Sequence, residues 1–160
     1  MKGSMWFGLI VALVVIVLDQ ASKAWIVGFF SERAGEPVAV LTSFLNFVLT
    51  GNRGMSFGLF NNNAAMNTAV FTVLAAVIVI ALLVWMRRAD NPVIRLALGM
   101  IIGGAIGNVI DRLTRGAVVD FLDFHLGNWH WYAFNVADAA ICLGVIGLLL
   151  DGLLARPKAA

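Results

Sequence analysis

The chain has 160 residues, of which 61% are hydrophobic and only 12% are charged. In soluble domains roughly a quarter of the residues are charged. The low charge of this chain, with its mean hydropathy of +0.93, therefore excludes an ordinary soluble domain. The net charge of +2 is too small to indicate a nucleic-acid partner, and the single cysteine, Cys142, excludes an intramolecular disulfide. The composition therefore predicts one integral membrane domain over residues 1–160.

Four apolar segments are long enough to cross a bilayer, which takes about 20 residues. The predicted spans cover residues 5–26, 67–86, 93–110 and 135–154. Each is predicted to be a helix, because backbone amides inside lipid must be hydrogen-bonded within their own segment. The first span follows Lys2 as a signal peptide would, but Asp19 and Lys23 interrupt it and no A-x-A cleavage site follows. It is therefore predicted to stay in place as a signal anchor.

Basic residues predict the orientation of the four spans. Those on one side of the membrane are Lys2, Arg87, Arg88, Arg95, Arg156 and Lys158. A smaller set on the other side is accompanied by acidic residues: Arg33, Arg53, Arg112 and Arg115, with Glu32 and Glu36. By the positive-inside rule the first side is cytoplasmic, which predicts that both termini are cytoplasmic.

Two segments, residues 27–66 and 111–134, are then predicted to face outward. In the first, the stretch 37–52 is rich in β-branched and aromatic residues and ends in a turn signal, which predicts a short β-structure. A re-entrant or interfacial piece is expected around residues 56–60. The second segment contains several Trp, Phe and Tyr residues, which favour the membrane–water interface, so it is predicted to lie at the outer surface.

Ionisable residues in the spans are few and gather toward the outer side. A charge at membrane depth costs at least about 2.5–3.5 kcal/mol, so each one calls for a structural or functional reason. They are predicted at or near the outer helix ends: Asp19, Lys23, Asp111, Arg112 and Asp138, with Asp120 just beyond the third span. Charge collected at one depth predicts a single site there.

Asp120 and Asp138 are the strongest candidates for chemistry. Asp120 lies in an apolar run, and Asp138 lies in the first turn of the fourth predicted helix. Two carboxyls at short range do not both ionise readily, and a pair with one proton can activate a water and protonate a leaving amine. The simpler interpretation, with Asp138 as a helix cap and Asp120 as a solvated loop residue, stays open here, because sequence separation does not show proximity.

The remaining polar residues of the spans have structural interpretations beside functional ones. Asp19 and Lys23 are four positions apart, so they share a helix face and are predicted to form a supporting ion pair. Asn108, Asp111 and Arg112 also share a face. Arg112 either extends toward the interface with Asp111 as its counter-charge, or holds a peptide carbonyl or a neighbouring carboxylate.

Two other patterns are weaker. His125 and His130 lie in the aromatic outer segment without a third metal ligand, which favours interfacial residues over a zinc site. Ser22 adjoins Lys23, so on a helix the two side chains diverge and a serine–lysine pair is not favoured; nothing specific supports Ser56.

Five motifs, in order, resemble those of bacterial lipoprotein signal peptidase, also called signal peptidase II. They are Asp19-x-x-x-Lys23, Asn52-Arg53-Gly54-Met55-Ser56-Phe57, the segment GAIGNVIDR from Gly104 to Arg112, Val118-Val119-Asp120-Phe121, and Phe134-Asn135-Val136-Ala137-Asp138. Each motif alone is weak, but five in this order on a four-span chain are specific, and they cover nearly the whole chain.

The resemblance implies an all-α membrane protein with four transmembrane helices, a small extracytoplasmic β-structure and an outer interfacial helix. It implies an intramembrane aspartic endopeptidase that removes the signal peptide from diacylglyceryl-modified prolipoproteins, cutting before the lipidated cysteine. By their match to the motifs, the implied catalytic residues are Asp120 and Asp138. The implied substrate-binding residues are Asn52, Asn108, Arg112 and Asn135. The implied supporting residues are Asp19, Lys23, Asp111 and Gly54.

The resemblance implies no metal and no cofactor, since an aspartate-activated water is the nucleophile. The implied partners are prolipoproteins with a lipobox, membrane lipids and globomycin-type cyclic peptide inhibitors. The implied location is the bacterial cytoplasmic (inner) membrane, with the active site toward the outer face. Two rival functions remain. A proton-coupled transporter would carry polar groups through the full membrane depth, and a non-catalytic assembly factor would tolerate loss of Asp120 or Asp138.

Overall fold

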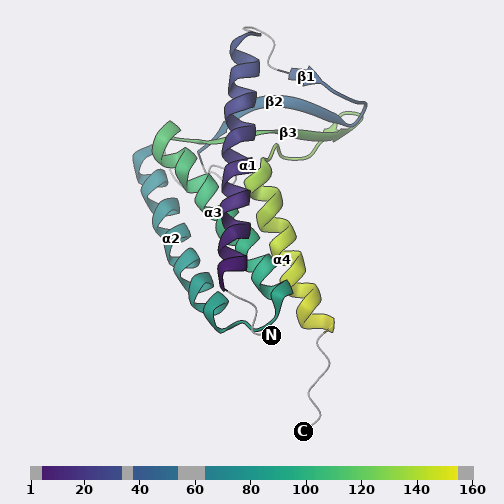
Figure 1. The fold of residues 1–160 in the computed structure, drawn as a ribbon. Helices are drawn as coiled ribbons and strands as arrows, with labels where there is room; N and C mark the ends of the chain where they lie inside the picture. Colours follow the sequence, from purple (N-terminus) through teal and green to yellow (C-terminus); the bar gives the residue numbers. More distant parts are fainter. Residues whose placement is uncertain (1–4, 34–37, 54–63, 155–160) are drawn as a thin grey trace.

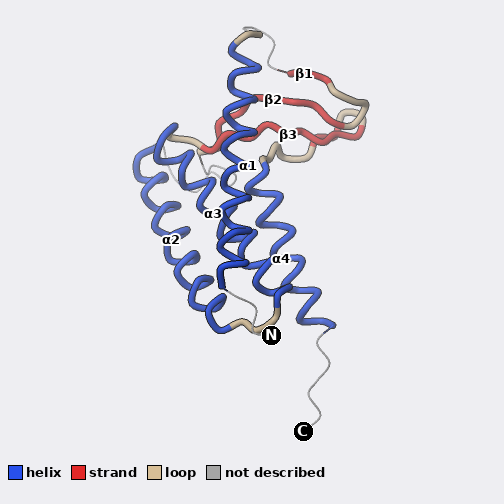
Figure 2. The backbone as a smooth tube through the Cα atoms, in the orientation of Figure 1, coloured by secondary structure: helices blue, strands red, loops and turns tan. Residues whose placement is uncertain are grey.

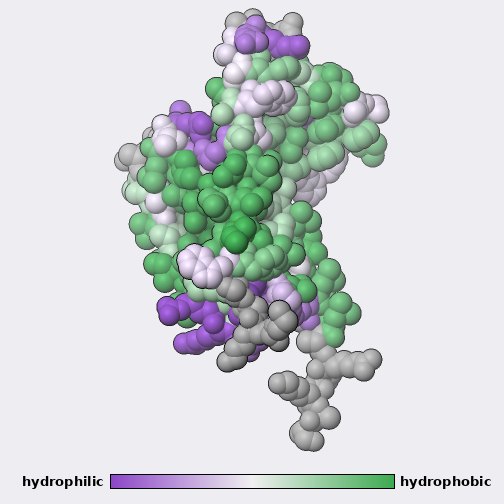
Figure 3. Space-filling model, viewed as in Figure 1, coloured by the Kyte–Doolittle hydropathy of each residue, from purple (hydrophilic) through white to green (hydrophobic). Residues whose placement is uncertain are grey.

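The structure, a computed structural model, describes residues 5–33, 38–53 and 64–154 (Figure 1). Its four helices are α1 (Met5–Ser31), α2 (Ala64–Arg88), α3 (Pro92–Arg115) and α4 (Val136–Leu154). Each contains a segment long and apolar enough to cross a membrane, which confirms the predicted four-span architecture. On the face that Figure 3 shows, apolar side chains cover the middle of the bundle, and hydrophilic groups lie toward both ends.

A small antiparallel sheet lies across one end of the bundle (Figure 2). Its strands follow the order β1 (Val38–Val40), β2 (Leu45–Asn52), β3 (Val118–Leu126) and β4 (Trp129–His130). The β-structure predicted within residues 37–52 is therefore confirmed. The third strand was not predicted, because its sequence was interpreted only as an aromatic interfacial segment. It becomes a strand by pairing with β2, as in Asn52 with Val118.

Two other expectations differ from the structure or lie outside it. Helix α1 continues to Ser31, so Asp19 and Lys23 lie inside the helix rather than near its end, and both are completely buried. The interfacial piece expected around residues 56–60, and the supporting residue Gly54, lie outside the described residues.

Helix α3 is the centre of the bundle, since the other three helices pack against it (Figure 1). Its glycines make this packing close. A Cβ at Gly103 would lie 2.6 Å from the backbone oxygen of Ala12 in α1, and one at Gly107 would lie 2.6 Å from the carboxylate of Asp19. The glycines thus serve helix packing, and Gly107 also leaves room for a buried carboxylate.

Candidate active site

The site is built on a buried ion cluster of Asp19, Lys23 and Asp111. The Lys23 ammonium lies 2.9 Å from Asp19 Oδ2 and 2.8 Å from Asp111 Oδ2, and all three side chains are fully buried. It also donates to Asn108 Oδ1 at 3.1 Å. The predicted pairing of Asp19 with Lys23 is confirmed, and a second carboxylate on α3 shares the same cation. Breaking such a cluster leaves an uncompensated buried charge.

The two carboxylates of the ion cluster also hold backbone groups on other elements. Asp19 Oδ1 accepts a hydrogen bond from the Ala137 amide at 2.9 Å, and Asp111 Oδ2 accepts one from the Val119 amide at 3.1 Å. Ala137 immediately precedes Asp138, and Val119 immediately precedes Asp120. The ion cluster therefore fixes the positions of both aspartate-bearing segments relative to helix α1.

Asp120 and Asp138 are connected through two asparagines. Asn135 Nδ2 donates to Asp120 Oδ1 at 2.7 Å, and Asn135 Oδ1 accepts the Asp138 amide at 2.9 Å. Asn108 Nδ2 donates to Asp138 Oδ1 at 2.7 Å. Asn135, rather than Asp138, thus caps the first turn of α4. The interpretation of Asp120 as a solvated loop residue is wrong, since it lies in β3 with only 2% of its surface exposed.

The environment of Asp120 raises the pKa of its carboxyl to about 6. Burial is the main cause, and the negative charge of Asp138 adds to it. Hydrogen bonds from Asn52 and Asn135 and the charge of Lys23 act in the opposite direction without cancelling the rise. Because Asp138 acts on Asp120 through its charge, the two carboxyls are coupled, and the pair exchanges a proton far closer to neutrality than a free aspartate does.

Arg112 lies close to the aspartate pair on helix α3. Among the described residues, Asp111 forms close ion pairs with Lys23 and Arg115, and its charge acts on Arg112 less strongly than the charges of Asp138 and Asp120 do. The Arg112 guanidinium lies over the Phe71 ring, 5.1 Å from its centroid, and Nη1 is 3.4 Å from the Asn108 carbonyl. Its charge interacts with those of the aspartate pair.

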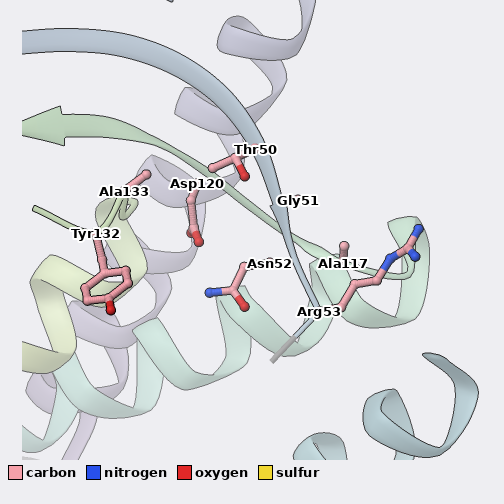
Figure 4. Close-up of a pocket in the computed structure, with 8 residues that line it drawn as sticks. All are labelled: Thr50, Gly51, Asn52, Arg53, Ala117, Asp120, Tyr132 and Ala133. Atoms are coloured by element: carbon pink, nitrogen blue, oxygen red, sulfur yellow. The ribbon is translucent and has the colours of Figure 1, made fainter. Parts of the chain in front are cut away.

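An open cavity of about 710 Å³ gives access to Asp120. Its lining residues come from β2, β3 and the loops beside them: Thr50, Gly51, Asn52, Arg53, Ala117, Asp120, Tyr132 and Ala133. Figure 4 shows Asp120 on one strand and Asn52 on its neighbour facing the same space, with Tyr132 at one side and Arg53 directed away. The structure thus brings Asn52 beside Asp120 at the same cavity.

The structure adds site residues that the sequence analysis missed. Gln20 donates to Asp19, to Asp111 and to the Gly107 carbonyl, and Arg115 forms an ion pair with Asp111. The spacing of Arg115, four positions after Asp111, was a usable signal. Gln20 gave none, because a single glutamine beside an aspartate has no specific pattern.

The two histidines of the outer segment lie on the sheet rather than in the site. Their rings stack with centroids 5.2 Å apart, and His130 Nδ1 lies 2.9 Å from Asp123 Oδ2. Ser22 donates to the Asp19 carbonyl, and Lys23 is occupied by the ion cluster, so the structure does not join Ser22 to Lys23.

The sequence profile of a family described as signal peptidase (SPase) II matches residues 11–154. The chain belongs to this family. A lipoprotein signal peptidase of Methylorubrum extorquens (strain PA1) is 47% identical over 152 residues, covering 95% of this chain and 88% of that protein. Another, of Rhodopseudomonas palustris (strain TIE-1), is 43% identical over 154 residues, covering 94% of this chain and 93% of the relative.

Two solved structures, both described as a bacterial membrane enzyme determined by the in meso method, share the fold of this signal peptidase. Each superposes with a TM-score of 0.76. The first is 26% identical and covers 93% of this chain and 94% of its own; the second is 28% identical and covers 96% and 93%. The membrane fold and the predicted family are therefore both confirmed, and the enzyme is a peptidase of the signal peptidase II type with four helices suited to a membrane.

Proposed function

We propose that this signal peptidase hydrolyses the peptide bond that precedes a diacylglyceryl-modified cysteine in prolipoproteins, with Asp120 and Asp138 as its catalytic pair. The observation that carries the proposal is the hydrogen-bonded chain that links the two carboxyls, from Asp120 through Asn135 and Asn108 to Asp138, with Asp120 lining an open cavity. The pairing of one proton with two carboxyls is the arrangement that aspartic proteases use to activate water.

The proposed reaction needs one ionised and one protonated carboxyl. The ionised carboxyl takes a proton from a water molecule, whose oxygen attacks the scissile carbonyl carbon. The protonated carboxyl then donates its proton to the departing nitrogen. The products are a signal peptide with a new carboxylate and a lipidated cysteine with a free amino group. The raised pKa of Asp120 supports a shared proton at near-neutral pH.

The other polar residues have proposed roles in binding and support. Asn52 faces the cavity beside Asp120, and the Arg112 guanidinium with Asn108 lies next to Asp138, so these side chains are placed to donate to carbonyl groups of the substrate. Lys23 and its two carboxylate partners hold the segments that carry the pair.

The proposed location is the bacterial inner membrane, with the sheet and the aspartate pair at the outer face and the termini in the cytoplasm. The exposed Arg87 and Arg88 end α2 at the far end of the bundle from the sheet, which supports this orientation under the positive-inside rule (Figure 1). This depth suits a substrate whose lipid lies in the outer leaflet. Globomycin-type cyclic peptides would compete for the same site.

The proposal is tested by cleavage of a diacylglyceryl-modified prolipoprotein by purified Asp120→Asn and Asp138→Asn variants in micelles. Asp123→Asn, on the same strand as Asp120, and Asp151→Asn, on the same helix as Asp138, are the matched controls. Both site variants are expected to lose turnover while the controls retain it. Near-normal turnover by either site variant would exclude the pair.

A further inference from the structure

A narrow apolar groove begins at the proposed active site and runs inward along the bundle. It has a volume of about 220 Å³ and is lined by α2, α3 and one residue of α4: Phe71, Leu74, Ala75, Ile78, Ile101, Ala105, Asn108, Arg112 and Ile141. Both α2 and α4 pack on α3, which forms the floor between them (Figure 1). We call this feature the inner groove.

The lining residues follow single helix faces. On α2 they run from Phe71 to Ile78, and on α3 from Ile101 to Arg112. At a rise of 1.5 Å per residue these stretches are about 10 Å and about 16 Å long. Only the outward end of the inner groove is polar, and there Asn108 holds the Asp138 carboxyl at 2.7 Å. The groove therefore leads from the proposed catalytic pair toward the middle of the membrane.

An unused hydrogen-bond donor lies at this polar end. Arg112 Nε is buried and has no hydrogen-bond partner among the described residues. The guanidinium face is covered by Phe71, which itself lines the groove. A buried donor without a partner is costly, so an acceptor that enters the groove at this end would satisfy it.

We infer that the inner groove holds one acyl chain of the substrate's diacylglyceryl group, with Arg112 Nε donating to an ester carbonyl. This inference rests on the proposed function. Over the roughly 10 Å of α2 that lines the groove, a helix about 10 Å wide would occupy about 800 Å³, whereas the groove holds about 220 Å³. The signal-peptide helix therefore does not fit inside the groove. A single apolar side chain is shorter than the groove. An acyl chain with an ester at its head matches both the apolar walls and the polar end.

The groove would act by positioning the substrate. Lipid tails are as apolar as the groove walls, so moving an acyl chain from the bilayer into the groove releases little free energy by itself. The favourable free energy of binding comes instead from van der Waals packing against the groove walls. A chain fixed in the groove sets the depth and register of the cysteine to which it is attached. Because small misplacements of reacting groups cost large factors in rate, the effect is expected in kcat/KM.

The test uses two lipopeptide substrates that differ only in their acyl chains, hexadecanoyl or butanoyl. Ala75→Phe and Ala105→Phe each fill the groove from a different helix, and Ala81→Phe, at an exposed position of α2 away from the groove, is the matched control. Both filling variants are expected to lower kcat/KM for the long-chain substrate about tenfold or more, while changing the short-chain value less than about twofold. Retained cleavage of the short-chain substrate also shows that each variant is folded.

Two results would overturn the inference. The first is an equal loss of kcat/KM on the long-chain and short-chain substrates in a filling variant whose stability matches that of the wild-type enzyme. The second is that neither filling variant loses kcat/KM selectively for the long-chain substrate. An additional peptide series, with the apolar residues before the cysteine shortened, identifies a side chain as the occupant if the filling variants respond to it instead of to acyl length. Failure of the proposed function is recognisable separately, because the wild-type enzyme would then cleave neither lipopeptide.

Discussion

Replacing Asp120 with asparagine is expected to abolish cleavage and, at neutral pH, to make the protein more stable. In the folded protein the pKa of this carboxyl rises from 3.8 to about 6, chiefly because of burial and then because of Asp138. A carboxyl whose folded-state pKa is raised costs no stability below its unfolded-state pKa, becomes more destabilising as pH rises between the two pKa values, and reaches its full cost above the folded-state pKa. Asparagine removes that ionisation but keeps an oxygen that accepts from Asn135 Nδ2.

The size of the effect follows from the rise of about two pH units. At about 1.36 kcal/mol per pH unit, the ionisation of this carboxyl costs up to about 3 kcal/mol at pH 7.5 and only about 0.5 kcal/mol at pH 4. For a chain of this size that is a rise in Tm of several degrees. The measurement is thermal unfolding of the wild-type protein and Asp120→Asn in detergent micelles at several pH values from 4 to 7.5.

The difference in Tm between the variant and the wild-type protein is expected to grow as pH increases across this range. Asp123→Asn is the control, because hydrogen bonds from Asn46 and His130 outweigh burial and lower the pKa of Asp123, so its replacement is expected to destabilise at neutral pH. A Tm difference for Asp120→Asn that stays constant with pH, or a variant that is less stable at pH 7.5, would refute the reasoning.

Three further predictions address the scaffold and its orientation. Lys23→Met leaves the buried carboxylates of Asp19 and Asp111 without their shared cation, so chemical unfolding should show a loss of about 3–5 kcal/mol; an unchanged unfolding free energy would contradict the ion cluster. Gly103→Ala brings a Cβ within 2.6 Å of the Ala12 carbonyl and should cost about 1–3 kcal/mol, whereas Gly152→Ala, with open space around it, should not destabilise. The topology can be tested by cysteine labelling in a Cys142→Ala background, with an impermeant thiol reagent applied from the periplasmic side. The reagent should label Val40→Cys in β1 but not Asp90→Cys between α2 and α3. The reverse labelling pattern would contradict the proposed topology.

The four spans were predictable because long charge-free runs leave few alternatives to a membrane helix. Strand β3 was not, because its state depends on pairing with β2, which lies far away in the sequence. Residues 118–126 carry aspartates at two positions and no clean alternation, so local sequence does not distinguish a strand from an interfacial segment.

The candidate site shows the same division between local and long-range information. The pairing of Asp19 with Lys23 follows from helix spacing alone. The hydrogen bond from the Ala137 amide to Asp19 joins residues 118 positions apart, and no local pattern indicates it. Phe71 was missed for a different reason, since an aromatic residue inside an apolar span looks like any other lipid-facing or packing residue.

The most direct test of the proposed chemistry compares single-turnover cleavage of one lipidated prolipoprotein by Asp120→Asn, Asp138→Asn and the double variant. Residues that act as a unit are strongly non-additive, so each single replacement is expected to remove as much activity as the two together. Losses that multiply in the double variant, or a rate close to that of the wild-type enzyme in either single variant, would contradict a shared catalytic role for the two aspartates.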